Sequence, residues 1–384
     1  MPTDLLKAIA KKMTEPADYI RFRSVCHSWR SSTSRFALPL HIPLLMLPYD
    51  PTTDVRPVHC LSSNQVRILF LPGMVNKIVL ASGRGWLVLL DITIPNGSLS
   101  LFNPLTGDEI QLPPTADFFH QPGYQFSRYN KKFVSVGHGK HGTKGLNEYA
   151  DIYPWRAFLS SRLIPINGHG MVMMSNCYSN KNDVAFCKVG DFSWTVLRTN
   201  LTQTIVSMAC HKDRFFMMDA GGNISVCNIA GPLESRLIHS LRVEPRGTLS
   251  FVTASKRLFV LVSYHEGADN SRNRKGCFRM FKLRLNTPLG PSRVESARGH
   301  ALFRCEAINQ SLAVRTKKDI PGYRPECVYF GAPFDFPEER LDGAAHEIDV
   351  LNLRTGNWEY LSSGWMRPLS GRLLPSIWVQ LSLC

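Results

Sequence analysis

From about residue 40 onward, apolar residues occur in short runs or alternate with polar residues, and Gly, Pro, Asn and Asp separate the runs. A period of two indicates strands with one buried face, and the separating residues indicate turns. No long helical pattern interrupts the runs, so crossover helices are not expected. The sequence therefore predicts a mainly β domain that is a sandwich, a barrel or a propeller.

The candidate strands are short apolar or alternating segments bounded by turn residues. They cover residues 42–47, 66–71, 77–81, 85–91, 98–102, 109–112, 133–136, 171–174, 183–188, 194–197, 204–209, 214–219, 223–228, 249–253, 257–263, 277–283, 301–305, 326–330, 347–351, 358–361 and 377–381.

Internal repetition favours a propeller among the three architectures. Residues 101–112 and 350–361 share an Asn, a Thr-Gly pair and a final Leu at the same spacing, and residues 223–228 are a weaker copy of 98–103. The Thr-Gly pairs predict tight hairpins that contain a left-handed residue. Repeated units of strand, turn and strand are typical of propeller blades.

Grouping the candidate strands in fours predicts about six blades. One blade would combine the strands within residues 42–71 with the strand at 377–381. That pairing would close the ring and remove an open sheet edge.

Residues 1 to about 36 have a helical period instead. Pro2 and Thr3 precede a first candidate helix, and the break at residues 15–17 is followed by Asp18, which can cap a second. Apolar residues recur at helical spacing on one face of this segment. They are Leu5, Leu6, Ile9, Met13, Phe22, Val25, Cys26 and Trp29. The segment is too short to bury this stripe alone, so it needs the rest of the chain or a partner.

The helical segment resembles an F-box. The residues that carry the resemblance are Pro2, Thr3, Asp4, Leu5, Leu6, Ile9, Met13, Asp18, Arg21, Val25, Cys26 and Trp29. They follow the order of the family pattern Leu-Pro-x-(Asp/Glu)-Leu-Leu, Ile, Leu, Asp-Leu and Val-Cys-x-x-Trp. Met1 and Met13 stand where the family has Leu. Family residues upstream of this motif are absent from the sequence, so residues 1–36 are expected to form an N-terminally shortened F-box.

The remaining residues, 37–384, resemble the plant KIB-type β-propeller family, formerly a domain of unknown function, which often follows an F-box. The landmarks are the segments at 85–87, 101–104, 110–113, 278–283, 300–303, 327–330 and 375–379. The expected fold is therefore mainly β, an about six-bladed β-propeller preceded by a short α-helical F-box.

The resemblance implies a non-catalytic substrate-receptor subunit of an SCF-type ubiquitin ligase. The F-box would bind a Skp-type adaptor and, through it, a cullin scaffold, and the propeller would bind a protein substrate. The expected adaptor-binding residues are Pro2, Leu5, Leu6, Ile9, Met13, Ile20, Val25, Cys26 and Trp29. Trp29 is the expected anchor, and Arg21, Arg23 and Arg30 would steer an acidic adaptor. Alternatively, the helices are a cap packed on the propeller.

The chain is strongly basic, with a formal net charge of +15. The helical segment contains seven Lys or Arg and three Asp or Glu, and the rest of the excess belongs to the propeller. Residues 271–284 contain six basic residues and no acidic one. Two functional interpretations are a nuclear-import signal and a nucleic-acid patch. We favour a third interpretation, a solvated loop followed by an outward-facing strand.

Several other classes of protein lack support in the sequence. There is no secretory signal, no run of 18 apolar residues and no Cys-x-x-Cys pair, so we expect free thiols in the cytoplasm or nucleus and no membrane partner. The glycine-rich stretch at 137–142 lacks phosphate-loop spacing and is interpreted as a surface loop.

No cofactor, metal site or catalytic residue is expected. The histidines at positions 138, 141, 169 and 211 are scattered, and Asp91, Asp219 and Asp335 end strands, where such residues order turns. A propeller module that binds protein or nucleic acid without a ligase is the alternative function. A propeller hydrolase is a further alternative, although no Ser-His-Asp or Cys-His pattern supports it.

Overall fold

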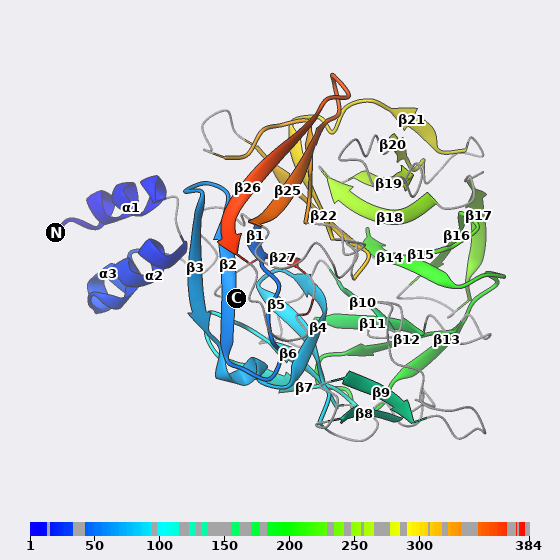
Figure 1. Cartoon of the computed structure of the whole chain (residues 1–384), viewed down its shortest axis with the longest axis horizontal. Helices are drawn as coiled ribbons and strands as arrows, with labels where there is room; N and C mark the ends of the chain where they lie inside the picture. The colour runs from blue at the N-terminus through cyan, green and yellow to red at the C-terminus, as the bar shows by residue number, and fades with distance from the viewer. Residues whose placement is uncertain are drawn as a thin grey trace.

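The computed structural model consists of six β-sheets arranged in a ring, with a group of short helices beside it (Figure 1). The described residues are 1–13, 16–33, 43–93, 98–114, 123–127, 132–136, 155–160, 170–176, 183–212, 214–228, 234–241, 247–254, 257–264, 277–284, 290–305, 308–316, 322–331, 345–366, 374 and 376–380. The six sheets confirm the predicted six-bladed β-propeller.

The blades follow one another along the chain, and within each blade neighbouring strands pair in the order in which they are named. Blade 1 contains β27 (Ile377–Gln380), β1 (Pro43–Met46), β2 (Val55–Cys60) and β3 (Gln65–Phe70). Blade 2 contains β4 (Lys77–Gly83), β5 (Trp86–Asp91), β6 (Ser98–Phe102) and β7 (Glu109–Gln111). Blade 3 contains β10 (Trp155–Leu159), β11 (Met171–Asn176), β12 (Asp183–Lys188) and β13 (Thr195–Arg198).

Blade 4 contains β14 (Ile205–His211), β15 (Arg214–Asp219), β16 (Asn223–Asn228) and β17 (Arg236–Ser240). Blade 5 contains β18 (Gly247–Ala254), β19 (Arg257–Tyr264), β20 (Cys277–Lys282) and β21 (Ser292–Val294). Blade 6 contains β23 (Gln310–Arg315), β22 (His300–Cys305), β24 (Cys327–Phe330), β25 (Ala345–Asn352) and β26 (Trp358–Met366). A hairpin of β8 (Gly123–Ser127) and β9 (Lys132–Val136) lies between blades 2 and 3 in the sequence.

The ring closes where the last strand pairs with the first. β27 is antiparallel to β1, with Pro43 opposite Gln380 and Met46 opposite Ile377. β27 also contacts β22 of blade 6 and β4 of blade 2, so it lies between its two neighbouring blades. This arrangement confirms the predicted pairing of the strand near 377–381 with the first strands.

An aromatic cluster fills the junction between blade 6 and blade 1. The Phe303 ring lies 4.9 Å from the Trp378 ring and 5.2 Å from the Tyr329 ring, measured between centroids. Tyr323 packs on Phe303 and donates a hydrogen bond from Oη to the Pro43 carbonyl, at 3.1 Å. Aromatic packing therefore stabilises the same junction as the β27–β1 hydrogen bonds.

The repeated sequence motif forms the same turn in blades 2 and 6. Asn103 Oδ1 accepts hydrogen bonds from the backbone N–H groups of residues 105 and 106, and Asn352 Oδ1 accepts them from residues 354 and 355. Gly107 and Gly356 follow with φ of 75° and 73°. These values confirm the predicted left-handed Thr-Gly turns. Gly occupies the position because it adopts this φ without steric cost.

The strand-ending aspartates order turns, as predicted. Asp91 Oδ1 accepts hydrogen bonds from Thr93 N (2.8 Å) and Thr93 Oγ1 (2.6 Å). Asp219 is fully buried and accepts from Asn223 N (2.9 Å) and Asn223 Nδ2 (3.0 Å). Asp335 and the stretches at 137–142 and 271–276 lie outside the described residues.

Six observed strands are missing from the sequence-based prediction: β2, β8, β10, β17, β21 and β23. β2 contains Arg56 and Pro57, which interrupt the apolar alternation, although five of its six residues are buried. β23 has polar residues at both ends and is only partly buried, and β21 is three residues long. The strand prediction depends mainly on hydrophobic periodicity, and the weak apolar pattern of these segments did not indicate strands.

Blade 6 also departs from the predicted grouping in fours. It has five strands, and β22 runs parallel to β24. β23 is an edge strand of this sheet, and it contacts β18 of blade 5.

The turn between β22 and β23 contacts several blades through two amides. Asn309 Nδ2 donates to the carbonyls of Val206 (2.6 Å) and Leu249 (2.9 Å), and the Gln310 amide bonds to both backbone groups of Ser82.

Three helices precede the propeller. They are α1 (Thr3–Lys12), α2 (Pro16–Ser24) and α3 (His27–Ser31), where one or two were predicted. Among the described helices, none is long and apolar enough to span a membrane. The predicted boundary between residues 36 and 37 falls outside the described residues and stays a prediction.

We expect Trp378→Ala to lower the free energy of unfolding by about 3–5 kcal/mol, because it removes a buried indole from the closing junction. Urea denaturation followed by circular dichroism would measure the loss. Tyr360→Ala is the matched control, since this aromatic residue is 52% exposed, and a change within about 0.5 kcal/mol is expected there. Equal losses in both variants would show that the junction does not depend on Trp378.

Candidate functional site

The three N-terminal helices pack around a small apolar core of their own. Leu6, Ala10, Tyr19 and Phe22 are buried in it, and Ile9, Met13 and Trp29 pack against it. The Trp29 and Phe22 rings are 4.4 Å apart between centroids. Leu105, in the turn after β6, also packs against this core, so the helices contact blade 2.

The helices divide the predicted adaptor-binding residues into two groups. Leu6 is fully buried, and Ile9, Met13 and Trp29 are partly buried in the helical core. Pro2, Leu5, Val25 and Cys26 are exposed, with Leu5 at 50% and Val25 at 59%. The side chain of Ile20 lies outside the described part of the chain.

For Val25, Cys26 and Trp29, the division arises because the chain bends between α2 and α3. Cys26 is extended, with φ of −165° and ψ of 173°, so Val25 and Trp29 do not follow one helical stripe. A pattern at positions i, i+3, i+4 and i+7 assumes one continuous helix. The sequence pattern therefore placed on one face residues that the structure separates.

The three arginines of this segment differ in their surroundings. Arg23 Nη1 donates to Thr33 Oγ1 at 2.8 Å and to the Arg30 carbonyl at 3.2 Å, so it fixes the end of α3. Arg21 forms an exposed ion pair with Asp18, at 3.1 Å. Arg30 is exposed and its Nε donates to the Arg23 carbonyl at 3.3 Å. Their charges remain beside the exposed apolar residues.

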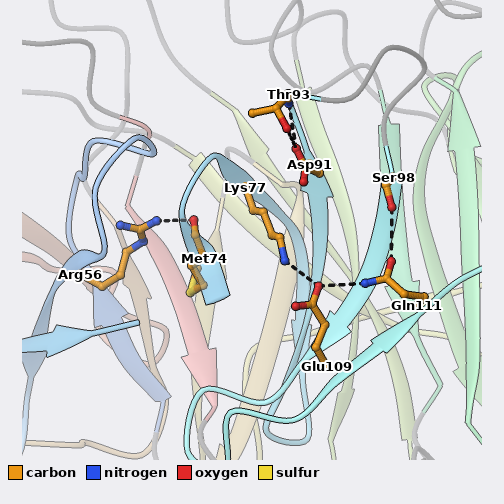
Figure 2. Close-up of polar contacts among 8 residues, drawn as sticks. All are labelled: Arg56, Met74, Lys77, Asp91, Thr93, Ser98, Glu109 and Gln111. Carbon is orange, nitrogen blue, oxygen red and sulfur yellow. Dashed lines mark hydrogen bonds and ion pairs between the residues drawn. The ribbon is translucent and has the colours of Figure 1, made fainter. Parts of the chain in front are cut away.

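Arg56 is a buried arginine with a structural role. Its side chain is fully buried, and Nη2 donates to the Met74 carbonyl at 2.6 Å (Figure 2). Nη1 donates to the carbonyls of Thr53 (2.7 Å) and Val55 (2.9 Å), and the guanidinium lies 4.3 Å from the Tyr49 ring centroid. Burial lowers the pKa of Arg56 and raises the pKa of Tyr49 to about 12. These groups join blade 1 to the 3-10 turn η2 (Pro72–Met74) before blade 2.

A second polar cluster joins the first and last strands of blade 2. Figure 2 shows Lys77 and Gln111 directed at Glu109, with Lys77 Nζ 2.6 Å and Gln111 Nε2 3.3 Å from Glu109 Oε1. Ser98 Oγ donates to Gln111 Oε1 at 3.3 Å. Burial acts to raise the pKa of Glu109, but hydrogen bonds from Lys77, Ser100 and Gln111 outweigh burial and lower it. This carboxylate is held charged by its neighbours, and the cluster has the form of a structural ion pair.

The described histidines and cysteines do not form a reactive site. Burial lowers the pKa of His59 and of His211, and burial raises the pKa of the Cys187 thiol to about 12. A thiol with a raised pKa is a poor nucleophile and a poor metal ligand. Seven described cysteines are free thiols, and six of them are buried. No group of His, Cys, Asp and Glu side chains that would suit a metal ion occurs within the described ranges.

Comparison with known proteins identifies one matching family and two relatives. The family model described as "KIB1-4 beta-propeller" matches residues 58–352. A putative F-box protein of Arabidopsis thaliana is 34% identical over 114 residues, which are 28% of this chain and 29% of that protein. A probable F-box protein of the same plant is 29% identical over 182 residues, or 40% of this chain and 48% of that protein. The chain thus spans less than half the length of these relatives.

Solved structures are less similar. The putative TolB of Agrobacterium tumefaciens is 9% identical, with a TM-score of 0.38 over 83% of this chain and 87% of that one. This likeness is too weak to bear on function.

We expect Glu109→Gln to lower the free energy of unfolding by about 1 kcal/mol at pH 7. A carboxylate whose pKa is lowered by folding stabilises the protein above its ordinary pKa, 4.5, and this contribution is lost as the pH falls through the folded-state value. Denaturant titrations at pH 7 and pH 3 would therefore show a difference from wild type at pH 7 only.

Glu359→Gln is the control for this experiment. Glu359 forms an ion pair of 2.8 Å with Arg324, and the Glu359 and Arg324 side chains are 47% and 46% exposed. A smaller change is expected there because solvent screens the pair. An undiminished difference for Glu109→Gln at pH 3 would contradict the assignment of its charge.

Proposed function

This chain belongs to the KIB1-4 beta-propeller family, and from that premise we propose that it is the substrate receptor of an SCF-type ubiquitin ligase. The N-terminal helices bind a Skp-type adaptor and, through it, a cullin scaffold. The propeller binds a protein substrate. The predicted resemblance to a plant F-box protein with a KIB-type propeller is confirmed by the family match and the relatives named as F-box proteins.

The exposed apolar residues of the helices are the observation that carries the proposal. Leu5 and Val25 stay half exposed or more although the helical core beside them is complete. Such residues lose unfavourable contact with water when a partner covers them. Arg21 and Arg30, both exposed, add positive charge that attracts an acidic adaptor. Leu5 and Val25 are the proposed adaptor contacts, and Leu6 and Trp29 hold the helices in shape.

A receptor of this kind acts by position and not by chemistry. Binding adaptor and substrate on one chain raises the effective concentration of the substrate near the ubiquitin-charged enzyme. The propeller supplies a rigid body whose loops and rims present the substrate. The buried Arg56 and Asp219 and the exposed Glu109 each bond to a neighbouring group of the propeller.

We also propose that the protein works in the cytoplasm or the nucleus. The support is the set of seven free thiols among the described cysteines, which suits a reducing compartment.

One observation favours the alternative of a helical cap without a ligase role. Leu105 of the propeller packs on the helical core, as it would if the helices only covered blade 2. A cap and an adaptor-binding F-box make different demands on the outer face, because only the F-box needs Leu5 and Val25 to contact a partner. Binding of purified adaptor decides between the two functions.

We expect the full chain to bind a purified Skp-type adaptor in a pull-down, and Leu5→Asp combined with Val25→Asp to weaken binding at least tenfold. A carboxylate at each position would be buried unpaired in the interface, at a cost of more than about 1.4 kcal/mol. Isothermal titration calorimetry would give the affinities.

Phe192→Asp is the matched control, since Phe192 lies on blade 3 and is 96% exposed. It should bind the adaptor as the wild type does. Absence of binding by the wild type would refute the ligase role, and binding retained by the double variant would refute this docking face.

A further inference from the structure

The outer rim between blades 4 and 5 carries a group of basic side chains on facing strands. Arg236 of β17 lies opposite Val226, and Arg293 of β21 lies opposite Phe281. Val226 and Phe281 both belong to the apolar core between these two blades. Paired residues of antiparallel strands share a sheet face, so Arg236 and Arg293 lie on the two faces that meet at this junction.

Further residues place more positive charge at the same junction. Arg279 lies opposite Val262, which is also in that core, and its guanidinium is 5.1 Å from the Tyr264 ring centroid. His239 Nε2 is 3.0 Å from the Arg284 carbonyl, so β17 is in direct contact with the segment that follows β20. We call the group Arg236, His239, Arg279, Arg284 and Arg293 the blade 4–5 seam. Blades 4 and 5 lie on the side of the ring away from the N-terminal helices (Figure 1).

Among the described residues, little acidic charge lies beside the seam. The strands β17, β20 and β21 contain no Asp or Glu. Glu234 and Glu295 flank the seam at strand ends, and both are exposed. Within the described part of the chain, Arg236, Arg284 and Arg293 are exposed and take part in no ion pair. Exposed, uncompensated arginines attract an anionic partner.

We propose that the blade 4–5 seam binds an acidic, extended segment of the protein substrate. Four of its five residues are arginines, whose planar guanidinium groups bind carboxylates through two parallel hydrogen bonds. Partly buried apolar side chains, Ile238 and Phe281, pack on the core between the two blades beside the charges. An extended peptide with alternating acidic and apolar residues matches this arrangement.

A peptide fits the seam better than a nucleic acid does. Nucleic-acid affinity depends on many phosphate contacts along a continuous basic track. The seam is confined to the rim of two neighbouring blades, and the aromatic residues beside it, Tyr264 and Phe281, are packed in the core between them. Carboxylate recognition needs only the few arginines that are present.

The inference rests on the proposed receptor function, and its test is separate from adaptor binding. The probe is a fluorescent peptide of alternating Glu and Val, compared with the same peptide carrying Gln for Glu, in anisotropy titrations with the full chain. We expect the Gln peptide to bind at least tenfold more weakly, and the affinity for the Glu peptide to fall with added salt.

Arg236→Gln with Arg293→Gln should weaken binding of the Glu peptide about five- to tenfold, because two exposed charge pairs are lost. Lys188→Gln with Arg354→Gln removes the same charge from exposed positions on blades 3 and 6 and should change affinity less than twofold. Both double variants should keep the unfolding midpoint and the adaptor affinity of the wild type.

Three results would overturn the proposal. They are equal binding of the Glu and Gln peptides, equal losses in the two double variants, and tighter binding of a single-stranded oligothymidylate of the same charge. Retained adaptor binding in any of these cases would leave the receptor function in place.

Discussion

The antiparallel pairing of β27 with β1 is the constraint on which the rest of the ring depends. It places Gln380 opposite Pro43 and so puts the two ends of the propeller sequence in one sheet. Without it, β1 would expose an unpaired edge, and blades 6 and 2 would lose the strand that lies between them. The aromatic cluster of Phe303, Tyr323, Tyr329 and Trp378 adds apolar burial at the same point.

The interior of the ring is held by amides as well as by apolar packing. Asn309 and Gln310, at one turn of blade 6, bond to backbone groups of β4, β14 and β18, which belong to three other blades. Ser311 adds a hydrogen bond of 2.8 Å to Ser250. Because amide side chains both donate and accept, they can pair with strand backbones that have no neighbour in their own sheet. The rim and loops are then left as the surfaces for partners.

Much of this architecture was predictable because its signals are local. The Thr-Gly turns after Asn103 and Asn352, the turn-ordering Asp91 and Asp219, and the closing strand at 377–381 all follow from residue type and spacing. β2 was missed because Arg56 interrupts its apolar pattern and is buried through hydrogen bonds to backbone carbonyls, including that of Met74 before blade 2. β23 was missed because polar residues begin and end it and it is only partly buried. Such strands are specified by tertiary contacts, which periodicity does not record.

The arrangement of the helical site was also only partly predictable from the sequence. The order of Leu5, Leu6, Val25 and Trp29 indicated a docking segment but not which residues face inward. For Val25 and Trp29, the bend at Cys26 separates the two side chains, and Trp29 packs against Phe22.

Ring closure by β27 also orders events during synthesis. The helices and β1 leave the ribosome first, whereas the strand that completes blade 1 is made more than 300 residues later. At about 5–20 residues per second, β1 waits for roughly 15 to 65 s without its partner. During that interval the helices already contain every residue of their own core except Leu105. A nascent chain can therefore present the proposed adaptor contacts, Leu5 and Val25, before the propeller ring is closed.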